Sequence, residues 1–216
     1  MKKSLNFAIL LISILFFSCT KKKVNILILG NSITHHIPNE SLGWKGNWGM
    51  AASSADNDFE SKLTQKLQGH YDVKVTAKNI AVWENDFNYD LDQFPELSNQ
   101  KYDILIIRLG ENVSEASPSF PNYEKELNAL INRYKNQNTK VIITGTVWSS
   151  IKKDSIQEKV AKDNAYQYIP LINFQGNPEN YATGKFENEQ VAAHPSDVGM
   201  ENIAELLFRK VEEVFR

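Results

Sequence analysis

The stretch VNILILGNSIT, residues 24–34, decides the fold. Its first half is a continuous run of β-prone apolar residues, which is typical of a strand buried on both faces of a parallel sheet. The run ends at a glycine followed by two polar residues, so the chain is expected to turn there. Two further stretches repeat the pattern, ILIIRLGEN at residues 104–112 and KVIITG at residues 140–145. Buried strands of this type predict a parallel sheet that is covered on both sides.

Amphipathic helices are predicted between the strands, because apolar residues recur there at helical spacing. The expected strands are Val24–Leu29, Val73–Ile80, Ile104–Leu109, Lys140–Thr144 and Gln167–Ile172. The expected helical stripes are Phe59/Leu63/Leu67, Tyr123/Leu127/Leu130/Ile131/Tyr134, Ile156/Val160 and Ile203/Leu206/Leu207/Val211/Val214. Together with the right-handed crossover rule, this alternation favours an α/β fold, a three-layer α/β/α sandwich with a five-stranded parallel sheet of the flavodoxin-like type.

The N-terminus has the layout of a bacterial lipoprotein signal. Residues 1–18 hold two lysines and an apolar run that is too short to span a bilayer, and three lysines follow at residues 21–23. The stretch Phe16–Cys19 resembles a lipobox, whose cysteine is acylated after cleavage. We therefore expect a signal peptide at 1–18, a lipidated tether at 19–23 and one domain at 24–216. The protein would be exported and held on a bacterial membrane by its lipid, facing the periplasm or the cell surface. A buried N-terminal helix is disfavoured, because it would bring the lysines against the core.

Composition excludes several classes of protein. The chain has 24 basic and 26 acidic side chains and a net charge of −2, which gives no electrostatic case for binding nucleic acid. Its single cysteine, Cys19, permits no internal disulfide. The adjacent His35 and His36 have neither a cysteine nor helical histidine spacing to complete a metal site, so we expect no metal. A nucleotide-binding flavodoxin-like protein is also disfavoured, because no phosphate-cradling glycine run follows the first strand.

Three polar loops are expected at the carboxyl edge of the sheet, where open parallel sheets bind their ligands. They are Gly30-Asn31-Ser32, Gly110-Glu111-Asn112 and the segment that begins at His194. Taken singly, each has a plain structural explanation, such as Ser32 capping a helix. Taken together, they supply a nucleophile, a general base and an amide donor for an oxyanion. That set is the minimum for acyl transfer.

The order Gly-Asn-Ser, Gly-x-Asn and His-Pro along the chain resembles the SGNH hydrolases, also called the GDSL esterase/lipase family. The resemblance extends from Ile26 to Ile203. It implies that Ser32 is the nucleophile, that Asn112 in the Gly110 loop donates its amide to the oxyanion, and that His194 is the base. The segment GWKGNWGMAA, residues 43–52, is similar to a stretch of exported SGNH proteins of Bacteroides type. The G-x-S-x-G elbow of another hydrolase class is absent.

Two positions depart from the family pattern. The family's second block contributes a glycine whose N–H joins the oxyanion hole, and this role falls here on the backbone N–H of Glu84 or, as a second choice, Ala81. The family's acid stands three residues before the histidine, where this chain has Val191. We expect Glu189, or else Glu187, to accept the hydrogen bond from His194 instead. A main-chain oxygen is the open alternative.

One further carboxylate and four tryptophans fall near the expected site. Asp197 follows the histidine but is expected in the first turn of the last helix, where a negative charge complements the helix dipole. The four tryptophans fall in predicted loops at the same edge of the sheet and could stack on sugar rings, or simply cover the sheet. They are Trp44, Trp48, Trp83 and Trp148.

These features predict a serine esterase that removes acyl groups, such as acetyl, from a small acylated substrate or a carbohydrate ester. The reaction would proceed through a Ser32 acyl-enzyme and need no cofactor. The alternative is a degenerate SGNH domain that has lost the acid and binds glycans without cleaving them.

Overall fold

The computed structural model describes residues 20–98 and 100–215, so the signal peptide and Cys19 lie outside the described residues. Its centre is a sheet of five parallel strands in the order β2-β1-β3-β4-β5. The strands are β1 (Lys23–Gly30), β2 (Asp72–Asn79), β3 (Ile104–Arg108), β4 (Lys140–Thr144) and β5 (Gln167–Ile169). The predicted five-stranded parallel sheet is confirmed. The fifth strand is shorter than predicted because Pro170, which has no N–H for a sheet ladder, follows Ile169 directly.

Four longer helices coincide with the predicted stripes, and three short ones were not anticipated. The longer helices are α1 (Phe59–Gln68), α4 (Tyr123–Tyr134), α5 (Ile151–Asp163) and α7 (Asp197–Phe215). The short ones are α2 (Ala81–Asn85), α3 (Pro95–Ser98) and α6 (Glu189–Ala192). Single 3₁₀ turns lie at Glu40–Leu42, Ala55–Asn57, Leu91–Gln93, Phe120–Asn122 and Pro178–Asn180. Stretches of four or five residues hold too few repeats for periodicity to reveal them.

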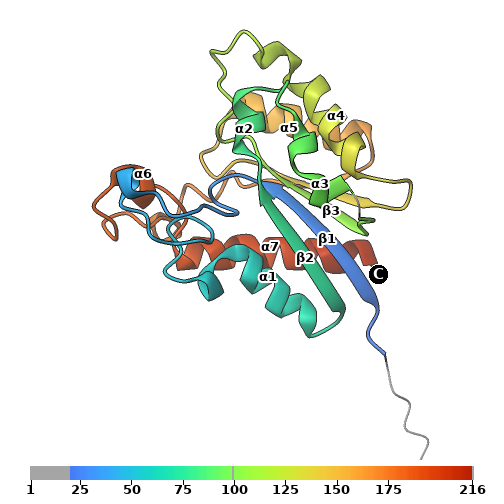
Figure 1. The fold of residues 1–216 in the computed structure, drawn as a ribbon, viewed down its shortest axis with the longest axis horizontal. Coiled ribbons are helices and arrows are strands. Elements are labelled where there is room, and N and C mark those ends of the chain that lie inside the picture. The colour runs from blue at the N-terminus through green and yellow to red at the C-terminus, as the bar shows by residue number, and fades with distance from the viewer. Residues whose placement is uncertain (1–19, 99, 216) are drawn as a thin grey trace, which may run out of the picture.

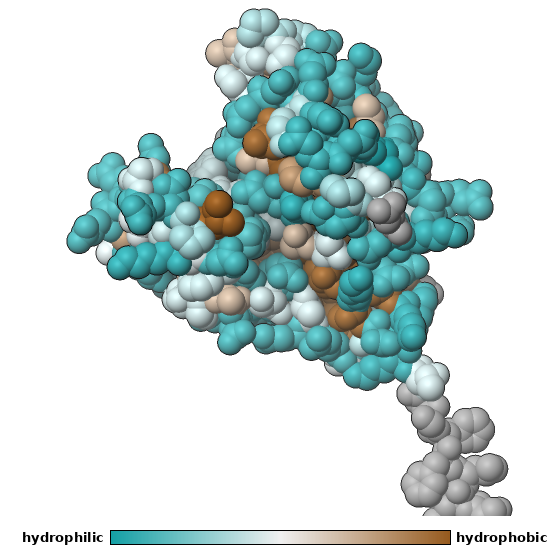
Figure 2. Space-filling view, in the orientation of Figure 1, coloured by the Kyte–Doolittle hydropathy of each residue, from teal (hydrophilic) through white to brown (hydrophobic). Residues whose placement is uncertain are grey.

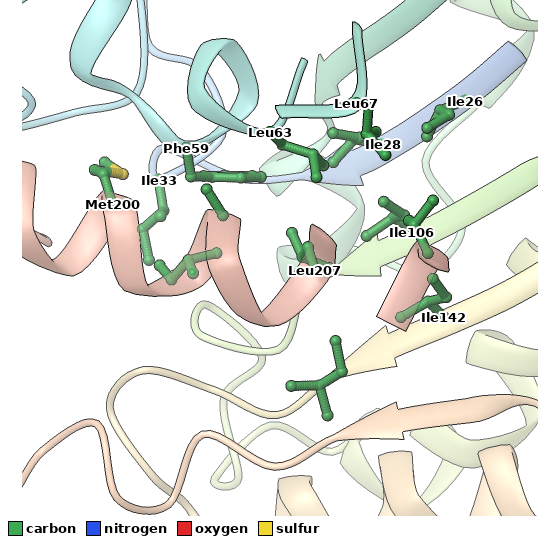
Figure 3. Packing of buried hydrophobic residues seen from close by; sticks show 14 of the residues in the cluster. Ile26, Ile28, Ile33, Phe59, Leu63, Leu67, Ile106, Ile142, Met200 and Leu207 are labelled. Carbon is green, nitrogen blue, oxygen red and sulfur yellow. The ribbon is translucent and has the colours of Figure 1, made fainter. Parts of the chain in front are cut away.

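Alternating side chains of each strand build two separate cores. On β1, Ile26 and Ile28 face α1 and α7, whereas Leu27 and Leu29 face the side covered by α4 and α5. Figure 1 shows the two helix layers on either side of the sheet, and Figure 3 shows the first core, with Phe59 of α1 and Leu207 of α7 packed over the strands. The three-layer α/β/α architecture is therefore confirmed.

The register of the sheet brings three loops to one level. Gly30 at the end of β1 pairs with Asn79 of β2 on one side and with Arg108 of β3 on the other. The segments that follow these three strands consequently begin side by side at the carboxyl edge. This arrangement allows residues distant in sequence to share one site.

The surface is mainly hydrophilic on the face shown in Figure 2, with small apolar patches. Near the N-terminal end, Lys22 Nζ lies 4.2 Å from the centroid of the Phe215 ring, and Lys21 donates to the Gln68 carbonyl. Two of the three lysines after the predicted lipidation site thus contact the domain. Within residues 20–98 and 100–215, none of the helices has the length and apolar character needed to cross a membrane.

Candidate active site

Ser32 and His194 meet at the carboxyl edge of the sheet. Ser32 lies two residues beyond the end of β1, and His194 lies between α6 and α7. The Ser32 Oγ is 2.9 Å from His194 Nε2, although 162 residues separate them. A hydroxyl within hydrogen-bond reach of an imidazole is the arrangement that a nucleophile and its base require.

The ring of His194 is oriented by a main-chain oxygen. Its Nδ1 lies 2.7 Å from the carbonyl oxygen of Gln190. Because a carbonyl can only accept, the Nδ1 position carries the hydrogen and Nε2 is left as an acceptor for the Ser32 hydroxyl. Burial lowers the pKa of His194 below its usual 6.5, while the bond to Gln190 partly opposes that shift. The imidazole is therefore neutral at pH 7 and competent as a base.

The predicted carboxylate partner of His194 was wrong. Glu187 and Glu189 are both exposed, and neither bonds to the histidine. Glu189 is the first residue of α6, directly after the N-cap Asn188, and it is exposed. Val191 cannot be replaced by an acid without cost, because its side chain is buried in an apolar cluster with Trp44. In the structure the acceptor for His194 Nδ1 is a main-chain oxygen, which is the alternative that the sequence left open.

Removing either exposed carboxylate is consequently expected to leave activity unchanged. Glu187→Gln and Glu189→Gln should match the wild type in ester turnover and in its dependence on pH, because neither side chain contacts His194. Steady-state kinetics of both variants and of the double variant would check this. A clear loss in any of them would mean that a carboxylate replaces Gln190 O in the working enzyme.

A buried carboxylate links Asn112 and Gly110 to the residue that precedes the nucleophile. Glu84, on α2, accepts from the Asn112 side-chain amide at 2.7 Å and from the Gly110 N–H at 2.5 Å. The Asn31 amide, next to Ser32, is 3.4 Å from the same carboxylate. Gly110 has φ +123°, and a Cβ there would lie 2.8 Å from Gln157 Nε2, so only glycine fits. The sequence predicts a role for the backbone N–H of Glu84, whereas in the structure its side chain is at the centre of the cluster.

A second carboxylate and a guanidinium extend this cluster. Glu111 accepts from Asn31 Nδ2 at 2.7 Å and from Arg108 Nη1 at 2.6 Å, and both charged side chains are buried. Glu111 also accepts from the Val147 N–H at 3.0 Å, which links it to the loop after β4. Sequence analysis did not assign a role to Arg108, Glu111 or Asn31. The one available signal was Arg108 itself, a charged residue within an otherwise apolar strand.

Burial, together with the neighbouring charge, raises the pKa of one of the two acids. Burial raises the pKa of Glu84 to about 7, and the neighbouring Glu111 carboxylate adds to the shift. Hydrogen bonds from Asn112 and Gly110 oppose it. Arg108 pairs with Glu111, and the buried Lys153 donates to the Glu111 main-chain carbonyl, so among the described residues no cation pairs with the Glu84 carboxylate.

The four tryptophans occupy three different environments. Trp148 stands edge-on to His194, with ring centroids 5.2 Å apart, and donates its N–H to the Ala193 carbonyl. Trp44 and Trp48 pack against each other at 5.7 Å. Trp83 is only 2% exposed and belongs to the core beneath α2. Its predicted contact with substrate was therefore wrong, since a wholly buried ring cannot stack on a ligand.

Two hollows flank the loop that follows Ser32. One, of about 530 Å³, is lined by Trp44, Trp48 and Phe186 together with Lys45 and Lys185. Trp44 is itself 3% exposed, so Trp48 and Phe186 offer most of the aromatic surface there.

The other hollow, of about 510 Å³, lies between the start of the same loop, the end of β2 and α2. It is lined by the exposed Ile37 and Val82 and by His35 and His36, with Ala81, the second choice for the oxyanion N–H, at its wall.

In the described part of the chain, no group of three or more His, Cys, Asp or Glu side chains is arranged to hold a metal ion. Asp197 is the first residue of α7, as predicted, and accepts from the Ser53 N–H at 2.8 Å.

Solved structures with similar folds include several ester hydrolases. The psychrotrophic esterase EstA from Pseudoalteromonas sp. is 14% identical, with a TM-score of 0.57 over 88% of this chain and 98% of EstA. A protein from Slackia heliotrinireducens named as an SGNH hydrolase is 17% identical, with a TM-score of 0.56 over 87% and 98%. CEX, a two-domain esterase active on acetylated mannans, is 14% identical, with a TM-score of 0.53 over 90% of this chain and 50% of CEX. The chain therefore has the α/β fold of these SGNH hydrolases and esterases.

A family model for the RdRP head domain matches residues 102–175. That segment contains β3, β4 and β5, which belong to the same sheet as β1 and β2, and it contains neither Ser32 nor His194. It covers less than half of the chain, so it carries no argument about activity. A comparison with curated proteins finds no match.

Proposed function

We propose that this protein is a serine ester hydrolase whose nucleophile is Ser32 and whose general base is His194. The observation that carries the proposal is the 2.9 Å contact between Ser32 Oγ and His194 Nε2, with the Nδ1 hydrogen held by the Gln190 carbonyl. This geometry leaves the lone pair of Nε2 directed at the hydroxyl that must lose its proton. The esterases of similar fold support the same reaction class.

The reaction follows from these contacts. As the Ser32 oxygen attacks the ester carbonyl, its proton moves to Nε2 of His194, and a tetrahedral oxyanion forms. When the intermediate collapses, the imidazolium returns the proton to the departing alcohol and an acyl-serine remains. Water, activated by the same imidazole, then releases the acid and restores the serine.

Two N–H groups near Ser32 can stabilise the oxyanion. The Ser32 backbone N–H has no acceptor among residues 20–98 and 100–215. The Asn112 amide nitrogen carries two hydrogens, of which one is directed at Glu84, so the other is available to substrate. Donors of this kind stabilise charge that develops only in the transition state.

The neutral acceptor at Nδ1 has a kinetic consequence. A carbonyl fixes the tautomer of His194 as a carboxylate would, but it stabilises the transient imidazolium less. Where nothing replaces the acid of a triad, turnover falls on the order of 10⁴-fold. We place this enzyme between that limit and a complete triad, because the hydrogen-bonding part of the acid's role is retained.

The substrate class we propose is an acylated carbohydrate. Trp148 stands beside the base and is partly exposed, and Trp48 borders a hollow of about 530 Å³ that also holds two lysines. Aromatic faces of this kind suit sugar rings. CEX, one of the structural relatives, acts on acetylated mannans.

The test is hydrolysis of acyl esters by the purified domain. A fluorogenic acetyl ester should be cleaved, acetate should be released from an acetylated polysaccharide, and an alkyl phosphonate should add once, on Ser32. Absence of all three reactions would refute the proposed activity.

The second candidate is a glycan-binding domain without turnover. The observation that favours it is that His194 has a carbonyl rather than a carboxylate at Nδ1. Such a protein would bind a deacetylated oligosaccharide in calorimetry and leave the acetyl ester and the phosphonate unreacted.

We also propose that the protein is exported and lipid-anchored through Cys19, on the sequence argument alone. Labelled fatty acid should enter the full-length wild type in cells and be absent from Cys19→Ser, because the acyl chains attach to that sulfur. Several buried acyl chains would hold the protein firmly on a membrane. Equal labelling of both proteins would refute the anchor.

A further inference from the structure

The carboxylate of Glu84 is the point at which three loops of the site converge. Its Oε1 accepts from the Gly110 N–H at 2.5 Å and from the Asn112 N–H at 3.3 Å, and its Oε2 accepts from Asn112 Nδ2 at 2.7 Å. Asn31, the residue before Ser32, reaches Oε1 at 3.4 Å. The side chain that carries these bonds is only 3% exposed.

We propose that Glu84 is a positioning residue, whose carboxylate holds the Asn112 amide and the Gly110–Asn112 loop in the geometry that receives the oxyanion. The inference rests on the proposed hydrolase function and adds to it the group that sets one of its donors. Glu84 itself touches no reacting atom. It acts through Asn112, whose amide could otherwise rotate freely at an exposed position.

A merely structural role would not explain this arrangement. Burying a carboxylate beside a second one is unfavourable, and both buried cations nearby are engaged elsewhere, since Arg108 pairs with Glu111 and Lys153 donates to the Glu111 carbonyl. A neutral or apolar residue at position 84 would be buried at less electrostatic cost. What the carboxylate alone supplies is two oxygens that can accept from both the backbone and the side chain of Asn112. Fixing a donor before reaction removes reorganisation from the transition state.

Several ionisable groups lie around this carboxylate. Glu111 of the loop after β3 and Tyr123 of α4 interact with it directly. Arg108 pairs with Glu111, and Lys153 of α5 has its Nζ 3.3 Å from the Glu111 carbonyl. Burial and Glu111 raise the pKa of Glu84 to about 7. Protonation below that pH removes one acceptor, so the Asn112 amide loses its partner as the pH falls.

Acylation of Ser32 should therefore require both an ionised Glu84 and a neutral His194. Because the pKa of Glu84 is raised and that of His194 is lowered in the free protein, the acidic limb of kcat/KM is governed by Glu84 and lies near pH 7. In Glu84→Gln the limb should move below 6.5, since only His194 then titrates. A side chain with a purely structural role would leave the limb where it was.

The deciding experiment is a double-mutant cycle between Glu84→Gln and Asn112→Ala. Glutamine keeps the shape but presents an N–H₂ to one of the donors. We expect kcat to fall about 10-fold to 10²-fold, the scale for a misplaced catalytic group, with KM little changed. In the Asn112→Ala background the same substitution should change kcat little, because the group through which it acts is already gone. Glu115→Gln, a change to an exposed glutamate on the same loop, is the matched control.

Two results would overturn the inference while leaving the hydrolase intact: an unchanged kcat and acidic limb in Glu84→Gln, or effects that simply add in the double variant. A wild type inactive towards esters and phosphonate would instead refute the hydrolase. In that case the side-chain amide signals of ¹⁵N-labelled Asn112 still test the positioning. They should shift and exchange faster with solvent in Glu84→Gln than in Glu115→Gln, and identical spectra would refute it.

Discussion

Ser32→Ala is expected to lower ester turnover on the order of 10⁶-fold, the scale seen when a nucleophile or its base is removed from a serine hydrolase. The hydroxyl oxygen is the atom that forms the covalent bond, and within residues 20–98 and 100–215 its one side-chain partner is His194 Nε2. The substitution removes no core contact, because the backbone bond between the Met50 N–H and the Ser32 carbonyl does not depend on the side chain. Thermal unfolding should therefore be unchanged while turnover is lost.

The paired variant His194→Ala provides the control for this result. Residues that act as one unit show losses that do not add, so the double variant should be no slower than either single variant. Residual turnover of more than a few per cent in Ser32→Ala would contradict the acyl-enzyme mechanism. Titration with an alkyl phosphonate would confirm that contaminating wild-type enzyme is absent.

Asn112→Ala is expected to lower kcat about 10²-fold to 10³-fold, which is the usual loss when one oxyanion donor is deleted. The reason is that the second hydrogen of Nδ2 remains available after the first is directed at Glu84. KM should change little, because the donor is needed for charge that develops after substrate binds.

A matched variant separates the donor from the loop that carries it. Ser114→Ala alters an exposed side chain two residues further along and should keep full activity. If Asn112→Ala and Ser114→Ala behaved alike, Asn112 would not be an oxyanion donor, and the Ser32 N–H would have to serve with another group. Measuring acylation in single turnovers would assign the loss to the chemical step.

The sequence predicted most of the fold because its signals are local. Continuous apolar runs mark β1, β3 and β4, and the stripe from Phe59 to Leu67 marks α1, because a strand or helix must present its buried face at a regular spacing. The same reasoning missed α2 and α6, whose turns are too short to show a period. Both carry important parts of the site, since α2 holds Glu84 and α6 leads to His194.

The sequence predicted those parts of the candidate site that depend only on the type of residue and on its order along the chain. Ser32, Asn112 and His194 follow or precede elements that end at the carboxyl edge, and the alternation of strands and helices in the sequence places that edge. Their pairing, Ser32 with His194 at 2.9 Å, agrees with that placement. Trp83 is different, because the sequence predicts an accessible loop there, whereas the residue lies in the short helix α2 and its side chain is buried in the core.

The sequence by itself determined the parallel sheet, the edge at which chemistry is possible and the types of side chain gathered there. Only the tertiary structure decided which atom holds His194, because any of several carboxylates or carbonyls near position 191 could reach the ring until the turn of α6 directs Gln190 O at Nδ1. It also decided that Glu84, which follows β2, faces Asn112, which follows β3, and that the Glu111 side chain pairs with Arg108. Hydrogen bonds need distances near 3 Å and defined angles, and such contacts between distant segments depend on how whole layers pack rather than on any local pattern.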